Sequence, residues 1–356
     1  MGEKNRAGNP NEQVYMATTV SGIEDIAASE MQSKYDDLKV LRKKRGKIFF
    51  RYEGSPGQLF SLRCVDNIYH FLGSFSIGPT KKDLAEIPRK LRAMNLSQRL
   101  IGLYGDLSAN SVIVSASRSG KHTYSRYQVA DAIQDALVEV FHFGRGTVEK
   151  HDLHFRVDVE DGSAFMHIKL TPATFRYRGQ EKQFLTAALK PSVAHAMVLL
   201  SLPGASDVFL DPFCGSGTIL AERASYEARE IIGSDISTER LEIARENLPE
   251  KISLHCWDAR HIELPSGTVD RIVSNLPWGK QIEIGDVSQL YTEFMIEAKR
   301  LLAPGGIMVL LTDQEVEIMR AAELAGVRIE KRTTLSLHGL NPSIFVAGMA
   351  DDLGVK

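Results

Sequence analysis

The stretch that decides the fold is Val208–Thr218, which reads VFLDPFCGSGT. Its apolar beginning predicts a strand that ends at Asp211, and a helix is expected to begin near Thr218 after the intervening glycines. Glycine lets the backbone turn and approach a ligand where a side chain would clash. The amino end of the helix then offers unpaired N–H groups. The stretch therefore predicts a ligand-binding turn, although a Gly-x-Gly pair alone is a weak signal.

Around this turn, predicted helices alternate with apolar strands through residues 180–356. The strands are expected at VFLD, IIGSDI, ISLHCWD, RIVSNLP and IMVLLT, and the helices at TILAERAS, TERLEIARENL and YTEFMIEAKRLL. This βαβα order is typical of a parallel sheet covered by helices on both faces. The ending RIEKRTTLSLHGLNPSIFVAG predicts two more strands joined by a short loop.

Acidic residues stand at three successive strand ends. Asp211 ends the first predicted strand, Asp235 the second and Asp258 the third. The second can accept both ribose hydroxyls of a nucleoside, and the third can accept from an adenine amino group. One such acid is equally well a helix N-cap, but three together favour nucleoside binding. A dehydrogenase is disfavoured because Ile219 and Leu220 follow the loop without the third glycine of the dinucleotide fingerprint.

The fourth predicted strand runs into Asn275–Gly279, NLPWG. This resembles the Asn/Asp-Pro-Pro-aromatic motif of enzymes that methylate exocyclic amines on nucleobases and glutamine. An aryl amine is a poor nucleophile because its lone pair is conjugated with the ring. The Asn275 oxygen and the Leu276 or Pro277 carbonyl can accept its two N–H bonds and direct the lone pair. Trp278 can stack on a base taken out of its helix; the alternative is a plain turn with a buried tryptophan.

The two motifs together resemble a known family. Asp211–Thr218 and Asn275–Lys280, NLPWGK, are similar to THUMP-domain guanine-N2 methyltransferases acting on tRNA, closest to the TrmN type. The resemblance implies S-adenosylmethionine as cofactor and N2-methylation of guanosine at position 6 of the acceptor stem. Position 10 of tRNA and an rRNA substrate are the alternatives. Large-subunit rRNA relatives usually read Asn-Pro-Pro-Tyr-Gly, so Leu276 and Trp278 disfavour rRNA.

The resemblance covers nearly the whole chain and divides it into domains. Residues 14–78 have the β-α-β-β-α order typical of a ferredoxin-like unit. Residues 79–178 contain a strand, a long helix and a hairpin turning at Asp161-Gly162, and correspond to a THUMP RNA-binding domain. Residues 179–356 form the Rossmann-like class I methyltransferase domain. The expected fold class is therefore α/β. Residues 1–13, ahead of the first domain, are expected to be a disordered tail.

The site residues follow from the motifs and the resemblance. The segment FLTAALKPS at residues 184–192 resembles the family segment that closes over the cofactor, and Leu337–Pro342 resembles its last hairpin. Catalysis is assigned to Asn275, Pro277 and Trp278. Cofactor binding is assigned to Ala188, Leu189, Asp211, Phe213, Cys214, Gly215, Ser216, Gly217, Thr218, Asp235, Ile236, Asp258, Ala259 and Asn275. The chain carries Glu181-Lys182 where relatives often have His-Arg.

Charge is divided unevenly along the chain. Residues 1–180 hold 26 Lys and Arg against 20 Asp and Glu, and residues 181–356 hold 17 against 25. A basic first half suggests contact with a polyanion, although the excess is modest and chance is the alternative. We predict RNA contacts at Arg42, Lys43, Lys44, Arg45, Arg118, Lys121, Arg126, Arg176 and Arg178. For each of these residues alone, a solvated surface charge explains the sequence equally well.

Other classes of protein are disfavoured. Cys64, Cys214 and Cys256 are far apart and form no Cys-x-x-Cys pair, so we expect no metal and a reducing, cytoplasmic location. No apolar run reaches the roughly 18 residues of a membrane span, so we expect no membrane partner. A non-catalytic RNA-binding adaptor is the alternative of another class. Asn275 and three intact strand-end acids argue against it.

Overall fold

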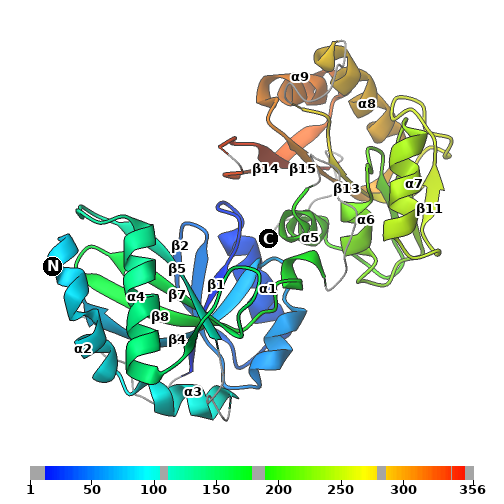
Figure 1. Cartoon of the computed structure of the whole chain (residues 1–356). Coiled ribbons are helices and arrows are strands. Elements are labelled where there is room, and N and C mark those ends of the chain that lie inside the picture. The colour runs from blue at the N-terminus through cyan, green and yellow to red at the C-terminus, as the bar shows by residue number, and fades with distance from the viewer. Residues whose placement is uncertain (1–12, 105–110, 179–188, 279–285, 338, 349–356) are drawn as a thin grey trace.

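The computed structural model describes residues 13–104, 111–178, 189–278, 286–337 and 339–348. Two α/β halves, each built on one sheet, lie side by side (Figure 1). We call residues 13–178 the N-terminal half and residues 189–348 the C-terminal half. Apart from Gln13, the predicted tail at residues 1–13 lies outside the described residues.

The N-terminal half contains a single eight-stranded sheet in the order β2-β3-β1-β4-β8-β7-β5-β6. Its strands are β1 Val14–Thr18, β2 Lys39–Lys44, β3 Lys47–Arg51, β4 Asn67–Ser76, β5 Ser111–Ser119, β6 Gly144–Arg145, β7 Leu153–Glu160 and β8 Ser163–Lys169. β4 pairs antiparallel with β8, so the two units expected at residues 14–78 and 79–178 share one sheet. The domain boundary at residue 78 stays a prediction, and it does not coincide with a break in the sheet.

Helices cover this sheet, among them the long helix predicted within residues 79–178. The α-helices are α1 Glu24–Lys34, α2 Ile87–Arg92, α3 Leu96–Tyr104 and α4 Arg126–Phe141, and the 3-10 turns are η1 Pro56–Ser61, η2 Lys81–Glu86 and η3 Phe175–Tyr177. Along α4, Val129, Ile133 and Leu137 are buried at four-residue spacing. The Ser125 side chain accepts from the Gln128 N–H, which starts the helix with a capping box. The predicted β7–β8 hairpin is confirmed.

The C-terminal half contains a seven-stranded sheet in the order β11-β10-β9-β12-β13-β15-β14. Its strands are β9 Val208–Asp211, β10 Glu230–Ser234, β11 Ser253–His255, β12 Val269–Asn275, β13 Leu302–Thr312, β14 Arg328–Thr334 and β15 Ser343–Gly348. The first five strands in this order are mutually parallel, whereas β15 is antiparallel to β13 and to β14. This confirms the predicted parallel sheet and its two added final strands.

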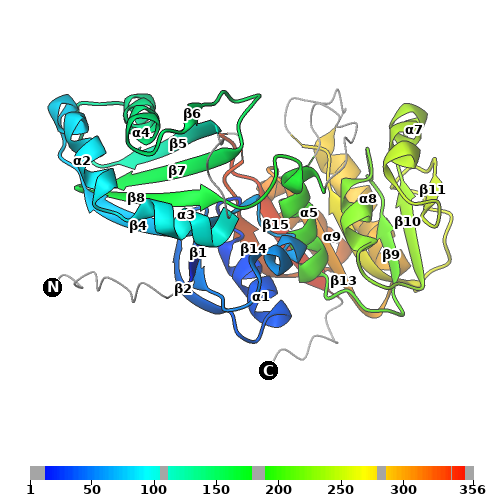
Figure 2. The same cartoon turned by 60° about the horizontal axis from the view of Figure 1, so that its bottom comes forward.

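Five helices of the C-terminal half are described, and they pack on this sheet (Figure 2). They are α5 Pro191–Leu200, α6 Thr218–Arg223, α7 Thr238–Asn247, α8 Val287–Leu301 and α9 Glu315–Ala325. A Cβ added to Gly233 of β10 would lie 2.4 Å from the Leu220 side chain, so α6 sits directly on the strand. Neither α5 nor α9 was predicted from the sequence, although Ile318, Ala321 and Ala322 mark the buried face of α9.

The two halves meet over a shared core. Ile23, just before α1, and Met31 on α1 belong to the same hydrophobic cluster as Val193 and Met197 on α5. Helix α1 lies beside α5 (Figure 1). A second contact is an isolated bridge between Ser21 and Ser336. Because apolar side chains from both halves are buried together, the halves are held by hydrophobic burial as well as by the linker.

Candidate active site

The cofactor loop begins with a deeply buried acid. Asp211 at the end of β9 is 1% exposed, and its carboxylate accepts from Ser274 Oγ at 2.6 Å and from the Phe213 N–H at 3.3 Å. Burial, with the nearby Asp235 charge, raises the pKa of Asp211 to about 7 despite these hydrogen bonds. Ser274 precedes Asn275, so this bond ties the catalytic strand to the cofactor loop. The sequence analysis did not single out Ser274.

Asp235, just after β10, holds the glycine loop from the neighbouring strand. Its Oδ2 accepts from the Gly215 N–H and its Oδ1 from the Ser237 N–H, both at 3.0 Å. A carboxylate has about four lone-pair sites, so acceptor capacity remains for a ligand. The next residue, Ile236, is 70% exposed and offers apolar surface beside it. The predicted ribose contact of Asp235 therefore fits this geometry.

Two glycines shape the loop for different reasons. Gly215 has φ +52° and a Cβ added there would meet no atom within 4 Å, so the loop faces open space on that side. Gly217 has φ +84°, and a Cβ there would lie 2.6 Å from the Leu248 side chain. Thr218 then begins α6, as expected. A strand-end acid, an open glycine loop and an exposed apolar side chain together suit a nucleoside with a charged tail.

The acid that follows β11, Asp258, is already paired with an arginine. Asp258 accepts from the backbone N–H and the guanidinium of Arg260, at 2.6 Å for the closest pair. These bonds from Arg260 hold the pKa of Asp258 below its ordinary value. Beside it the rings of His255 and Trp257 are stacked with centroids 4.0 Å apart, and Ala259 is buried. A predicted adenine amino group would therefore share the Asp258 carboxylate with Arg260, a residue that the sequence analysis missed.

The loop after β12, for which the sequence predicts a catalytic role, is fixed by internal hydrogen bonds. Trp278 Nε1 donates to Asn275 Oδ1 at 2.9 Å. Tyr291 of α8 donates its hydroxyl to the Pro277 carbonyl at 2.6 Å and lies 2.7 Å from Thr312 Oγ1. The buried Tyr291 gave no signal in the sequence, because only the folded loop brings it to Pro277. The Pro277 carbonyl keeps one lone pair after the Tyr291 bond, and the Leu276 carbonyl is the other candidate for the second amine N–H.

Two predicted cofactor contacts lie at or beyond the edge of the described residues. Ala188, most of the segment 184–192 and Gly279 after the catalytic loop lie outside them, as does His338 within the last hairpin. Leu189 is described, is partly buried and packs against the shared core between the halves. Phe213 of the glycine loop packs edge-to-face on Phe294 of α8, with ring centroids 5.2 Å apart, so α8 supports this loop.

The predicted RNA contacts fall into two groups. One residue is corrected: Arg178 donates to buried Glu222 at 2.9 Å, and only 12% of its side chain is exposed, so it serves the junction between the halves. The others lie at the surface, several with partners. Lys43 pairs with Asp25, Lys44 with Glu160, and Arg45 with Ser336. Three of the arginines lie over aromatic rings: Arg42 over Phe49, Arg126 over Tyr127 and Arg176 over Tyr177. Arg118 lies beside the His122 ring, and Lys121 is exposed.

Two families of methyltransferases match parts of this chain. The family described as "RMKL-like, methyltransferase domain" matches residues 178–341, and a family described as "DNA methylase" matches residues 3–246. Both matches include the loop at 208–218. The tRNA (guanine(6)-N2)-methyltransferase of Thermus thermophilus is 29% identical over 348 residues, covering 93% of this chain and 98% of that protein. The enzyme of the same name from Archaeoglobus fulgidus is 23% identical, covering 93% and 91%.

Solved structures give the same architecture. TrmN from Thermus thermophilus superimposes with a TM-score of 0.80 at 27% identity, covering 95% of this chain and 99% of that one. A putative methyltransferase complexed with SAH superimposes with a TM-score of 0.72 at 19% identity, which shows the shared fold.

The sheet order, the glycine loop and these matches define a class I S-adenosylmethionine-dependent methyltransferase. Within that class, the chain belongs to the family described as "DNA methylase", whose match spans residues 3–246, and it is similar to tRNA guanine-N2 methyltransferases such as TrmN of Thermus thermophilus. None of the described helices is long and apolar enough to cross a membrane.

Proposed function

We propose that the protein transfers a methyl group to the exocyclic N2 amine of a guanosine in tRNA, at position 6 of the acceptor stem. The observation that carries the proposal is the position of Asn275, which ends β12 and is joined through Ser274 to Asp211 of the cofactor loop. An amide acceptor thus stands beside the place where the methyl donor is expected, which is the arrangement that methylation of a weakly nucleophilic amine requires.

S-Adenosylmethionine supplies an electrophilic methyl group when it is bound. The residues that would hold it are Asp235 for the ribose, the Gly215–Gly217 backbone for the methionine part and Asp258 for adenine. This fits the open side of Gly215 and the exposed face of Ile236. The protein's task is then to orient the amine and to exclude water from the reacting atoms. The nitrogen becomes cationic as its new bond to the methyl group forms and the bond from the methyl group to the donor sulfur breaks. One N–H proton then leaves to solvent along the hydrogen bond that held it, and no strong base is needed because an N-alkylated aryl ammonium is strongly acidic.

The amine is oriented by the catalytic loop. Asn275 Oδ1 has two lone pairs and Trp278 uses one of them, so one amine N–H can take the other. The Leu276 or Pro277 carbonyl accepts the second N–H, and Tyr291 keeps the Pro277 peptide in place. With both N–H bonds engaged, the nitrogen lone pair is turned toward the methyl group. Trp278 supplies an aromatic face on which the extruded base can stack.

The choice of tRNA and position 6 rests on how much of the chain each relative matches. Enzymes named for position 6 in Thermus, Archaeoglobus and Methanocaldococcus match across 93% of this chain. A tRNA (guanine(10)-N2)-dimethyltransferase of Methanothermobacter matches 44% of it, and a U6 snRNA guanine-N2 methyltransferase of Bos taurus matches 54%. The match across the N-terminal half therefore favours position 6 over position 10. A tRNA substrate would place the enzyme in the cytoplasm.

The exposed basic residues of the N-terminal half are proposed to grip the RNA. Arg118 and Lys121 near the end of β5 and Arg126 at the start of α4 lie close together in sequence and are exposed. Arg126 stacks on the exposed ring of Tyr127 at 4.8 Å, which pairs a cation with an aromatic face. Such surfaces hold phosphates and unstacked bases without reading sequence. A flipped base needs such a hold away from the reacting atom.

The test is direct. Purified protein is incubated with labelled S-adenosylmethionine and unmodified tRNA, digested nucleosides are identified by mass spectrometry, and the modified position is mapped. We expect N2-methylguanosine at position 6 and none when that guanosine is replaced by adenosine. Methylation of rRNA alone, or at tRNA position 10, would replace the substrate assignment. Retention of cofactor without transfer to any RNA would favour the non-catalytic adaptor.

A further inference from the structure

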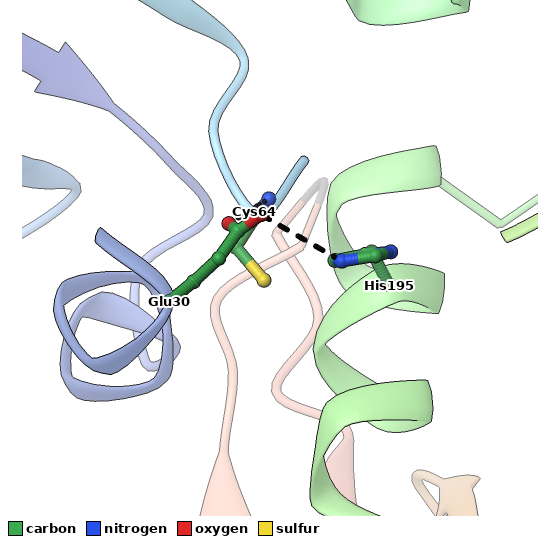
Figure 3. A group of neighbouring side chains, drawn as sticks. All are labelled: Glu30, Cys64 and His195. Atoms are coloured by element: carbon green, nitrogen blue, oxygen red, sulfur yellow. Dashed lines mark hydrogen bonds and ion pairs between the residues drawn. The ribbon is translucent and has the colours of Figure 1, made fainter. Parts of the chain in front are cut away.

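A cluster of buried charges joins the two halves. We call it the junction cluster: Glu30, Arg63, Arg178, His195 and Glu222. It combines α1, the loop between η1 and β4 and the residue after η3 of the N-terminal half with helices α5 and α6 of the C-terminal half. Figure 3 shows Glu30 on α1, Cys64 next to Arg63 and His195 on α5 facing one another.

Glu222 is the centre of the cluster. It is 1% exposed and accepts from Arg63 Nε at 2.7 Å and from Arg178 Nε at 2.9 Å, while His195 Nδ1 lies 3.1 Å away. Burial favours the neutral acid, yet the close approach of His195 Nδ1 and the two guanidinium charges outweigh it and lower the pKa of Glu222 to about 2. One carboxylate thus binds three separate parts of the chain.

Glu30 fixes the other side of the junction. It is 2% exposed and accepts from Lys34 Nζ and from the backbone N–H groups of Arg63 and Cys64, each at 2.8 Å. The His195 ring lies between the two acids, with Nε2 3.7 Å from Glu30 Oε1. Arg63 therefore contacts Glu30 through its backbone and Glu222 through its side chain, so its position is fixed from both halves.

A metal site is the competing explanation of this cluster, because the ligand atoms of Glu30, Cys64 and His195 lie within 4.8 Å of one another. The surroundings oppose it. The Lys34 ammonium already occupies the Glu30 carboxylate, and burial together with the two acids raises the pKa of the Cys64 thiol, whereas a metal needs a thiolate. Hydrogen bonds within the chain account for the cluster better.

The cluster is placed where it can affect the reaction. Glu222 lies four residues after Thr218, which is about one turn or 6 Å along α6. The same short helix thus begins at the cofactor loop and ends at the cluster. Buried ion pairs contribute little net stability compared with apolar packing but are demanding in geometry. Their role here is therefore to fix the relative position of the two halves.

We propose that Arg63, Arg178 and Glu222 are specificity-determining positioning residues. By fixing the N-terminal half to α6, they set the distance between the RNA grip and Asn275, and so decide which guanosine along an RNA helix enters the site. The inference rests on the proposed function. A loosened junction would let neighbouring guanosines reach Asn275, because a displacement of about 3 Å corresponds to one base-pair step of a nucleic-acid helix.

The first experiment maps methyl positions on tRNA for Arg63→Gln and Arg178→Gln, with Arg63→Lys as the conservative variant. The matched control is Arg229→Gln, which removes an exposed partner of Asp270 in the same enzyme. We expect methyl groups on guanosines next to the wild-type position, a kcat lowered about tenfold by ångström-scale misplacement, and cofactor affinity within about twofold of wild type. Arg63→Lys should recover most of the single-position product. Product confined to the wild-type position in both Gln variants overturns the inference.

A second experiment needs no variant. One base pair is inserted in the acceptor stem on either side of the methylated guanosine, and wild-type enzyme is used. A fixed junction predicts that one insertion moves the methyl group by one nucleotide and the other does not. A methyl group that stays with the original guanosine in both RNAs overturns the inference and leaves the proposed function intact. Failure of wild-type enzyme to methylate any tRNA would instead refute the proposed function.

Discussion

The two halves of the molecule differ in the sequence separation between the residues that form their key hydrogen bonds. In the C-terminal half, Asp235 reaches Gly215 of the adjacent loop, and its role follows from its position at a strand end. In the N-terminal half, Arg63 and Arg178 reach Glu222, which is 159 and 44 residues away. Local position reveals a ligand site, whereas the partner of a charged side chain is revealed only by the fold.

The largest expected effect tests the long-range contacts. Glu222→Ala leaves Arg63 and Arg178 without their shared acceptor in a buried site, so the free energy of unfolding should fall by about 3–5 kcal/mol. Urea denaturation measures it. Glu263→Ala, at an exposed position of the same half, is the control and should change stability by about 0.5 kcal/mol or less. Equal effects of the two substitutions would show that the junction cluster is not a structural centre.

The same carboxylate predicts a dependence on acid. The pKa of Glu222 is lowered from 4.5 to about 2 in the fold, so the unfolded chain takes up its proton first as the pH falls. The stability that this group contributes is complete above pH 4.5 and is lost as the pH falls toward 2. Urea midpoints of Glu222→Gln should fall less over that range than those of wild type. Parallel curves would contradict the low pKa.

The next effect tests the local contacts. Asn275→Ala removes the amide acceptor for the amine, and methyl transfer should fall by about two orders of magnitude or more, the scale of losing one transition-state hydrogen bond. Cofactor affinity should stay near wild type, because the backbone of the glycine loop is unchanged. Single-turnover rates with saturating RNA measure the chemical step. A wild-type rate would remove Asn275 from the mechanism.

A smaller loss is expected at the cofactor pocket. Asp235→Ala removes an acceptor for two backbone N–H groups and for the proposed ribose hydroxyls. S-Adenosylmethionine binding should weaken by about 1.5–3 kcal/mol, the scale of hydrogen bonds to a charged group. Titration calorimetry measures the affinity, and thermal unfolding without cofactor separates the loss of ligand contacts from damage to the loop. Wild-type affinity would refute the ribose role.

The smallest expected effect concerns Arg118 and Arg178, which were both predicted from the sequence to contact RNA. Arg118 is exposed, whereas Arg178 is committed to Glu222. If Arg118 contacts a phosphate, Arg118→Ala should lower the slope of log affinity against log salt by about one, and Arg178→Ala should leave that slope unchanged. Filter binding of tRNA over a salt series measures both. An equal change of slope in the two variants would return Arg178 to the RNA-contacting group.

Features that depend on local sequence were predictable, whereas features that depend on long-range contacts were not. The succession of strands along the C-terminal half, the glycine turn at 208–218 and the position of Asn275 at the end of β12 were predictable, because apolar runs and strand-end residues are local patterns. α9 was missed because its buried face is made largely of alanines. Tyr291 and Ser274 were missed because their hydrogen-bond partners, Pro277 and Asp211, reach them only in the folded chain. Arg260 was missed although its partner Asp258 is two residues away. The pairing of β4 with β8, about 95 residues apart, has no local signature either.

The shared core between α1 and α5 has a consequence for how the protein opens. Side chains of both halves are buried in one cluster, so neither half can expose its face of the junction without the other losing its cover. The chain should then behave as one cooperative unit, with a single transition on heating in place of the two that separate domains show. Cofactor binding at the C-terminal loop should slow amide hydrogen exchange in α1, because a ligand that binds only the folded state suppresses every opening that passes through global unfolding.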